Sequence, residues 1–236
     1  SSPSSAPIAA AAAFTAAAIA ASTASCGCLR STVNVAAPGM VLRDAGWLQF
    51  YAADPQEVFD LVCIAYAVCE RRDISLPAMV CHDGFIVSHV SERLWAPVQQ
   101  QIDAFLPPLG QPQRPVLDVE RPQQFGEVLF PEWYPAYEKK RHDAMLRAAC
   151  AFEEACERWR ALSGRVHAAV EAYRCDDAEV ILVGVGSHML TACHAVDQMR
   201  DAGSARVGVA RIKQYRPFPV ARVREIVAKA RVVAVL

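Results

Sequence analysis

Residues 178–187, AEVILVGVGS, decide the fold class of this chain. The apolar run from Ala178 to Val183 predicts a buried strand, and the two glycines after it predict a tight turn into a helix. Further along, the pattern predicts a helix over 188–202, a strand over 206–212, a helix over 219–230 and a strand over 231–236. Strands that alternate with helices in this way predict a doubly wound α/β fold with parallel pairing and right-handed crossovers.

The upstream part of the chain shows the same alternation. Gly46 to Tyr51 predicts a short strand, and Asp54 followed by Pro55 predicts a helix start with a glutamate at capping-box spacing. An apolar run over 76–81 predicts a second buried strand that ends in a turn. A long helix with an apolar stripe is expected over about 131–162.

Composition divides the chain into four segments. Serine and alanine dominate the beginning, and five prolines fall between Leu106 and Pro122. Stretches of this kind are typical of leaders and extended connectors rather than of packed elements. We therefore expect a low-complexity leader over 1–39, a first α/β unit over 40–106, a proline-rich connector with the long helix over 107–165, and a second, truncated α/β unit over 166–236.

The overall composition excludes several classes of protein. The chain has 236 residues, of which 53% are hydrophobic and 21% charged, and this excludes disorder for most of its length. A formal net charge of −1 excludes a strongly basic nucleic-acid-binding protein. The best candidate for a membrane span, residues 8–24, is mostly alanine and too weakly apolar. We expect neither nucleic acid nor membrane as a partner.

Charge and cysteine usage indicate an intracellular chain that meets other chains. Residues 205–236 hold eight basic groups and one acidic group, which predicts either a surface for a partner or anionic ligand, or a solvated helix face together with some internal pairing of charges. The nine cysteines lie mostly in apolar patterns without any C-x-x-C, as is typical of reduced cytoplasmic thiols. We expect no metal site on this chain, and an organelle location only if the Ser-rich leader is a transit peptide.

The turn after the strand at 76–81 holds the first candidate site residues. Asp83 and His89 follow that strand, and ligands of open α/β sheets gather at the carboxyl ends of strands. The two side chains are therefore candidates for positioning a substrate or cofactor or for moving a proton. The alternative interpretation makes Asp83 a turn former and His89 a helix cap or an interface group.

Two more candidates concern anions and interfaces. Ser187 follows Gly184-Val185-Gly186 at a predicted helix start, where backbone amides can bind a phosphate, or where the turn simply allows close packing. Position 189 is Met, so the stretch is not G-x-G-x-x-G, which argues against a nicotinamide cofactor. Arg216 precedes Pro217 in a rigid turn and could bind a carboxylate or a neighbouring subunit.

Five blocks of the sequence carry a resemblance to a known family. The chain resembles the alpha chain of 2-oxoacid:ferredoxin oxidoreductases, closest to the pyruvate enzymes, over about residues 40–236. The block over 76–89, Pro-Ala-Met-Val-Cys-His-Asp-Gly-Phe followed by Ser88-His89, is the most specific of them. The matching blocks are Asp44 to Tyr51, Leu76 to His89, Phe105 to Pro108, Glu132 to Tyr134, and Arg216 to Pro219.

The resemblance implies a fold and a function. It implies a partial thiamine-diphosphate-binding fold of the pyrimidine type over 40–106, and a parallel α/β domain like the transketolase C-terminal domain over 166–236. The implied activity is oxidative decarboxylation of pyruvate to acetyl-CoA with electrons passed to ferredoxin. Thiamine diphosphate would be shared with a partner chain, and iron–sulfur clusters and Mg would sit on other chains, among beta-, gamma- and delta-type partners.

The chain also departs from the family pattern. Ala/Ser-rich sequence stands where the family has the early part of its first domain, including the glutamate that activates the aminopyrimidine, and His82 stands at a position expected to be apolar. No catalytic residue is therefore transferred to this chain, and the isolated chain is expected to be inactive. Two alternatives stay open, a non-catalytic α/β interaction module and a chain of another thiamine-dependent 2-oxoacid dehydrogenase or transketolase-like enzyme.

Overall fold

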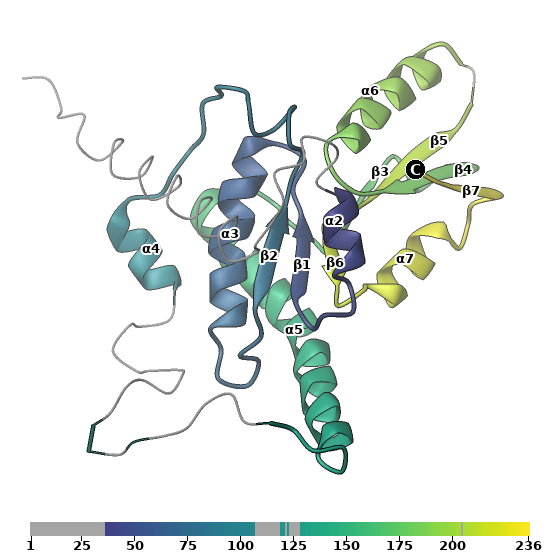
Figure 1. Cartoon of the computed structure of the whole chain (residues 1–236). Helices are drawn as coiled ribbons and strands as arrows, with labels where there is room; N and C mark the ends of the chain where they lie inside the picture. The colour runs from purple at the N-terminus through teal and green to yellow at the C-terminus, as the bar shows by residue number, and fades with distance from the viewer. Residues whose placement is uncertain (1–35, 107–118, 121, 123–127, 204) are drawn as a thin grey trace, which may run out of the picture.

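The computed structural model of the chain describes residues 36–106, 119–120, 122, 128–203 and 205–236 (Figure 1). Residues 1–35 and most of the proline-rich connector lie outside this described part. The elements are α2 (Ala36–Val41), β1 (Leu48–Tyr51), α3 (Pro55–Cys69), β2 (Ala78–Cys81), α4 (Gln99–Phe105), α5 (Tyr134–Ser163), β3 (Val170–Tyr173), β4 (Val180–Gly184), α6 (His188–Asp201), β5 (Val207–Ile212), β6 (Gln214–Arg216), α7 (Val220–Val227) and β7 (Val232–Val235).

The first sheet has the strand order β2-β1-β6. β1 pairs with β2 in parallel, with Tyr51 opposite Cys81, and with β6 in antiparallel orientation. Every residue of β1 is buried, because α3 and α5 cover one face and α2 lies against the other. Gln49 on that second face donates its side-chain amide to the carbonyl of Gly39 at 3.0 Å. Burial on both faces explains why the other three residues of β1, Leu48, Phe50 and Tyr51, are aliphatic or aromatic.

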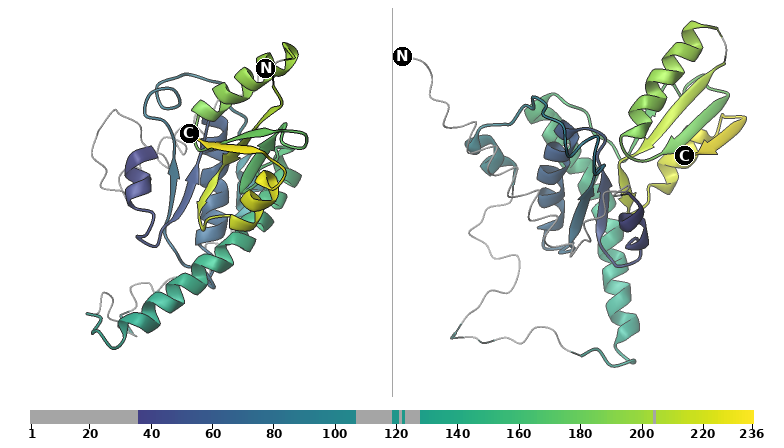
Figure 2. Two further views of the ribbon diagram at one scale, coloured as in Figure 1. Left: turned by 90° about the vertical axis from the view of Figure 1, so that its right-hand side faces the viewer. Right: turned by 45° about the horizontal axis from the view of Figure 1, so that its top comes forward.

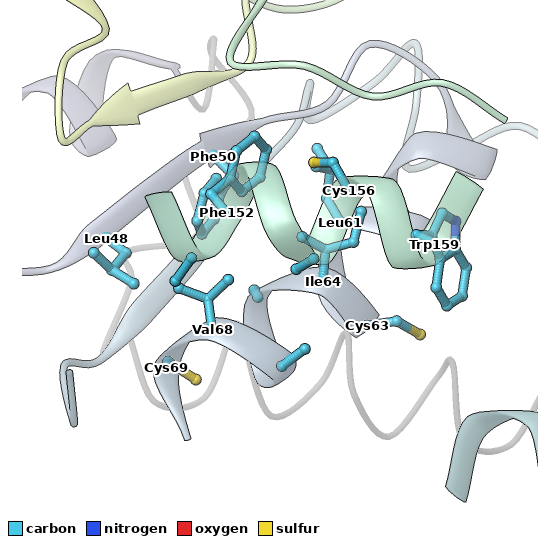
Figure 3. Packing of buried hydrophobic residues seen from close by; sticks show 14 of the residues in the cluster. Leu48, Phe50, Leu61, Cys63, Ile64, Val68, Cys69, Phe152, Cys156 and Trp159 are labelled. Carbon is cyan, nitrogen blue, oxygen red and sulfur yellow. The ribbon is translucent and has the colours of Figure 1, made fainter. Parts of the chain in front are cut away.

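Aromatic and aliphatic side chains fill the space between the first sheet and its two long helices (Figure 3). The ring of Phe50 stacks on Phe152 of α5 at 5.0 Å, and Trp159 meets Phe105 of α4 edge-on at 5.0 Å. Leu61 of α3 is fully buried between them. Each such side chain contributes about 1.5–3 kcal/mol when it leaves water, so this cluster holds α3, α4 and α5 to the sheet.

The start of α3 confirms the predicted cap. The carboxylate of Asp54 accepts the backbone N–H of Glu57 at 2.8 Å, and Pro55 occupies the first helical position. The side chain of Glu57 accepts the backbone N–H of Ala53 at 2.9 Å, which is one residue earlier than a standard capping box. This shift turns the Glu57 carboxylate toward the second sheet.

The second sheet has the order β3-β5-β4-β7. β4 pairs in parallel with both β5 and β7, which confirms the predicted α/β class. α6 packs Met189 and Val196 against one face, whereas Ile226 of α7 packs against the other. Figure 2 shows these two helices on either side of the sheet. This is the doubly wound arrangement that the alternating pattern predicted.

The sequence patterns did not predict two of the strands, β3 (Val170–Tyr173) and β6 (Gln214–Arg216). β3 runs antiparallel to β5 at the sheet edge, and β6 follows β5 after a single residue, Lys213, but pairs with β1 of the first sheet. The backbone N–H of Tyr51 donates to the carbonyl of Lys213 at 2.7 Å. The domain boundary near residue 165 stays a prediction, and strand pairing crosses it.

The described helices include none that is both long and apolar enough to cross a membrane. The longest of them, α5, buries one stripe and exposes charged groups on its other sides. None of the seven cysteines within the described residues forms a disulfide, and five of them are buried.

Candidate functional site

The carboxyl ends of β1 and β2 lie at the same edge of the first sheet, because the two strands are parallel. β1 leads there into the start of α3, and β2 leads into a long loop that reaches α4 (Figure 1). Asp83 lies half-buried in this loop and His89 is exposed. The structure therefore places both predicted residues at the edge where open α/β sheets bind ligands.

His89 is held firmly although it is exposed. The hydroxyl of Ser88 donates to the carbonyl of Gly84 at 2.6 Å and lies 2.7 Å from His89 Nδ1. The imidazole ring stacks on the ring of Phe85, with centroids 5.0 Å apart and 13° between the planes. The backbone N–H of His89 donates to the carbonyl of Phe85 at 3.2 Å, which closes one helical turn. The ring is thus fixed in position and plane.

Asp83 and His89 are not a bonded pair. Within the part of the chain that is described, no hydrogen bond or ion pair joins their side chains. His82 Nδ1 instead lies 3.2 Å from the backbone carbonyl of Asp83, to which it donates. The two candidates therefore sit on one loop but act as separate groups.

Ser187 and Arg216 lie elsewhere. Ser187 occupies the N-cap position of α6, but its hydroxyl makes no cap bond and is buried without a described hydrogen-bond partner. Arg216 donates to the backbone carbonyl of Arg43 at 2.7 Å and to Asp44 at 3.0 Å. Its guanidinium thus ties β6 to the segment before β1, within this chain.

Lys213 lies at the centre of a buried cluster of charges where the chain passes between the sheets. Its Nζ lies 2.9 Å from Glu57 Oε1 and 2.9 Å from His167 Nδ1, and it also contacts Glu171. The side chain is only 1% exposed. All three ammonium protons therefore have acceptors, which is the condition for burying such a charge.

Arg211 completes the same cluster from β5. It donates two hydrogen bonds to Glu57, at 2.5 and 2.6 Å, and a further one to Glu171. Burial by itself raises the pKa of Glu57, but the bonds from Arg211 and the charge of Lys213 outweigh it and hold the pKa at about 2. Glu57 is therefore ionised at every physiological pH.

Asp60 extends the cluster one helical turn along α3. Its carboxylate accepts two hydrogen bonds from Arg165, at 2.6 and 2.8 Å, and lies 2.9 Å from His167 Nε2. Burial opposes the charge, but the bonds from His167 and Arg165 lower the pKa of Asp60. We call the whole set the joint network, and it comprises Glu57, Asp60, Arg165, His167, Glu171, Arg211 and Lys213.

The joint network contains a group with the composition of a metal site. Glu57, His167 and Glu171 each offer a ligand atom, and these atoms lie within 4.8 Å of one another. Lys213 Nζ contacts all three residues. The ammonium group therefore takes the position that a cation would need.

Sequence reasoning missed the joint network. Its members on α3 are separated from their partners in the network by 105 to 156 positions in the chain, so no local spacing reveals the pairing. One signal was present, since Glu57 and Asp60 stand in a helix whose other inward positions are apolar. Buried acids in such a helix require buried cations from another element.

A cavity of about 350 Å³ lies away from these residues. It is lined by Gly46 and by Ser75, Leu76 and Pro77, which precede β1 and β2, and by the first half of α5. It therefore opens at the amino ends of the strands. The candidate residues at the carboxyl edge do not contribute to it.

Comparison with known proteins places the chain in a family. The sequence profile described as "Pyruvate flavodoxin/ferredoxin oxidoreductase, thiamine diP-bdg" matches residues 31–156, which is more than half of the chain. The chain belongs to this family. A second profile, "Pyruvate:ferredoxin oxidoreductase core domain II", matches residues 178–236. These matches confirm the resemblance and its α/β fold class.

Curated relatives agree with the family. The pyruvate synthase subunit PorA of Methanothermobacter thermautotrophicus is 41% identical over 194 residues, which cover 82% of this chain and 50% of the relative. The PorA of Pyrococcus furiosus is 40% identical over 82% of this chain and 48% of its own length. The alpha subunit of an NADH-dependent phenylglyoxylate dehydrogenase from Aromatoleum evansii is 33% identical over 84% and 49%.

The chain spans about half the length of the curated relatives it matches. Among solved structures, the 2-oxoglutarate:ferredoxin oxidoreductase of Magnetococcus marinus matches with a TM-score of 0.49 and 15% identity, over 83% of this chain and 36% of that one.

Proposed function

We propose that this chain is the alpha-chain part of a pyruvate:ferredoxin oxidoreductase, which decarboxylates pyruvate oxidatively to acetyl-CoA and passes electrons to ferredoxin. The observation that carries the proposal is the match of residues 31–156 to a thiamine-diphosphate-binding oxidoreductase family. The identity of about 40% to pyruvate synthase subunits supports pyruvate as the substrate. A cytoplasmic location belongs to the same proposal and is supported by the reduced thiols of the described part, where no disulfide is formed.

The described residues fit the aminopyrimidine ring of thiamine diphosphate better than its diphosphate group. The loop after β2 presents the ring of Phe85 and the imidazole of His89, which suit an aromatic ring such as the aminopyrimidine. The carboxylates of Glu57 and Glu171 are engaged by Lys213 and offer no site for a magnesium diphosphate. We therefore assign the diphosphate, Mg and iron–sulfur clusters to partner chains, and thiamine would supply the carbanion-stabilising chemistry.

In this proposal the chain works in a complex with beta-, gamma- and delta-type partners. Asp83 and His89 lie at the sheet edge where the cofactor ring would approach, and their role is to bind and orient it. Ser187 and Arg216 remain proposed contacts for an anion or a neighbouring subunit. Because Arg216 already bonds Asp44, a partner carboxylate would compete with that contact.

Reconstitution tests the proposal. The chain is co-expressed with candidate beta-, gamma- and delta-type chains, and reduction of ferredoxin or viologen is measured with pyruvate, coenzyme A and thiamine diphosphate. We expect turnover by the complex and no release of carbon dioxide by the chain alone. His89→Ala should leave assembly intact and reduce turnover by less than the roughly 10²–10⁴-fold that a proton-transfer group supplies. Robust turnover by the isolated chain would contradict this division of labour.

One relative supports a second candidate function. The phenylglyoxylate dehydrogenase subunit acts, by its name, on another 2-oxoacid and with a nicotinamide acceptor. The same complex is therefore assayed with phenylglyoxylate and with NAD. Faster reduction of NAD than of ferredoxin would favour this candidate. A chain whose second domain is folded but which binds no beta-type partner would favour a non-catalytic interaction module.

A further inference from the structure

Hydrogen bonds decide where the proton of His89 sits. Ser88 Oγ lies 2.6 Å from the carbonyl oxygen of Gly84 and 2.7 Å from His89 Nδ1. A hydroxyl has one proton to donate, and a carbonyl oxygen has none. Two oxygens at 2.6 Å repel unless a proton lies between them, so the proton of Ser88 must point at Gly84.

The donor and the acceptor of the bond between Ser88 and His89 are then determined. Because the proton of Ser88 is committed to Gly84, Ser88 Oγ can only accept from His89, and His89 Nδ1 must donate. In the neutral ring this leaves Nε2 without a proton. The side chain is exposed, and the stack on Phe85 fixes the plane of the ring.

We infer that His89 presents an unprotonated Nε2 at the carboxyl edge of the first sheet, as an acceptor for an N–H or O–H donor of the ligand bound there. Ser88 is the positioning residue that selects this tautomer. The ligand that fits this acceptor is the aminopyrimidine of the cofactor, whose amino group supplies an N–H donor, and this assignment rests on the proposed function. The tautomer itself rests only on the geometry of this loop.

The chain carries an internal reference for the opposite tautomer. Lys213 is a donor only and lies 2.9 Å from Nδ1 of His167, so that Nδ1 must accept. The proton of His167 is therefore on Nε2, which donates to Asp60 at 2.9 Å. One spectrum can thus show both tautomers in one folded chain.

Nitrogen NMR tests the inference without any activity assay. Long-range ¹H–¹⁵N correlation spectra of the labelled full chain are recorded at about pH 9, where imidazole rings are neutral, with His89→Gln and His167→Gln to assign the resonances. We expect the unprotonated nitrogen to be Nε2 in His89 and Nδ1 in His167. Ser88→Ala should shift His89 toward the Nε2-protonated form, whereas Ser88→Thr, which keeps the hydroxyl, and Ser91→Ala, an exposed control in the same loop, should not. A protonated Nε2 in the unmodified His89 overturns the inference.

Kinetics of the reconstituted complex tests the acceptor role. Losing one hydrogen bond to the ligand should lower kcat/KM about tenfold in His89→Ala and in Ser88→Ala. His89→Gln, whose amide oxygen can take the place of Nε2, should retain more activity than His89→Ala. Equal losses in the Gln and Ala variants overturn the acceptor role. A complex that turns over no 2-oxoacid refutes the proposed function instead, and the NMR result then stands by itself.

Discussion

Lys213 is only 1% exposed, and its ammonium group has three acceptors. These acceptors offset the free-energy cost of burying its charge, and they lose that compensation when Lys213 is replaced. Replacement by methionine keeps the length of the side chain but leaves Glu57 and Glu171 with less positive charge in a dry site. Breaking a buried ion pair from one side costs about 3–5 kcal/mol. We therefore expect Lys213→Met to lower the free energy of unfolding by that amount, measured by urea denaturation. The exposed Lys229→Met is the matched control, and equal losses in both variants would contradict the role of the joint network.

Glu57 makes stability depend on pH in a defined direction. Its pKa is depressed from 4.5 to about 2 in the folded chain, so its contribution is fully present above the unfolded value and lost as pH falls toward 2. The shift corresponds to about 3 kcal/mol. We expect the free energy of unfolding to fall between about pH 5 and pH 2, and to fall less steeply in Glu57→Gln. Glu92→Gln, an exposed change, should keep the full slope, and an unchanged slope in Glu57→Gln would refute the assignment.

At this scale the sequence predicted residues that act locally and missed those that act across the chain. The Asp54 cap followed from neighbours three positions apart. The cationic partners of Glu57 and Asp60 come from β5, from Lys213 directly after it and from the segment before β3, and no local spacing in the sequence predicts these pairs. The placement of Asp83 and His89 at the sheet edge followed from topology, but the bond from Ser88 to Gly84 required coordinates.

The elements themselves depend on signals of different strength. The start of α3 and the position of β4 were predicted nearly correctly, because caps and apolar runs act within the segment. β3 and β6 were missed because each has only three or four residues and polar side chains. What makes them strands is a neighbouring strand, which single-sequence patterns do not contain.

The N-cap of α3 should contribute more to stability than an ordinary helix cap, because the same turn orients Glu57. Asp54→Ala removes the acceptor for the N–H of Glu57 and should cost about 1 kcal/mol from the cap itself. We expect a larger loss here, because Glu57 would also shift against Arg211 and Lys213. Asp54→Asn, which keeps a capping side chain, should stay near the unmodified chain in thermal denaturation. If Asp54→Ala lowers the stability by no more than the loss of an ordinary cap, the cap and the position of Glu57 are independent of each other.

The two sheets are connected where the chain passes from β5 through Lys213 into β6, which we call the crossing. β6 adds to β1 immediately after Lys213, and the joint network connects α3 to β3 and β5 at the same place. A view of the chain as two independent units would predict two separate unfolding transitions. Because strand pairing and buried charges connect the two sheets, the stability of each sheet instead depends on the other sheet being folded.

We therefore expect the two sheets to unfold as one cooperative unit. The amides of Phe50 in β1 and Val209 in β5 lie in the central strands of their sheets, and native-state hydrogen exchange in increasing urea should bring both to the same opening free energy. Lys213→Met, which acts at the crossing, should lower both values together, whereas Lys229→Met should lower neither. Val233 should exchange earlier, since β7 lies at the edge of the second sheet as far as the structure describes it, pairs there with β4, and exposes most of its side chains. Distinct opening energies for Phe50 and Val209, with only one of them sensitive to Lys213→Met, would show that the crossing does not couple the sheets.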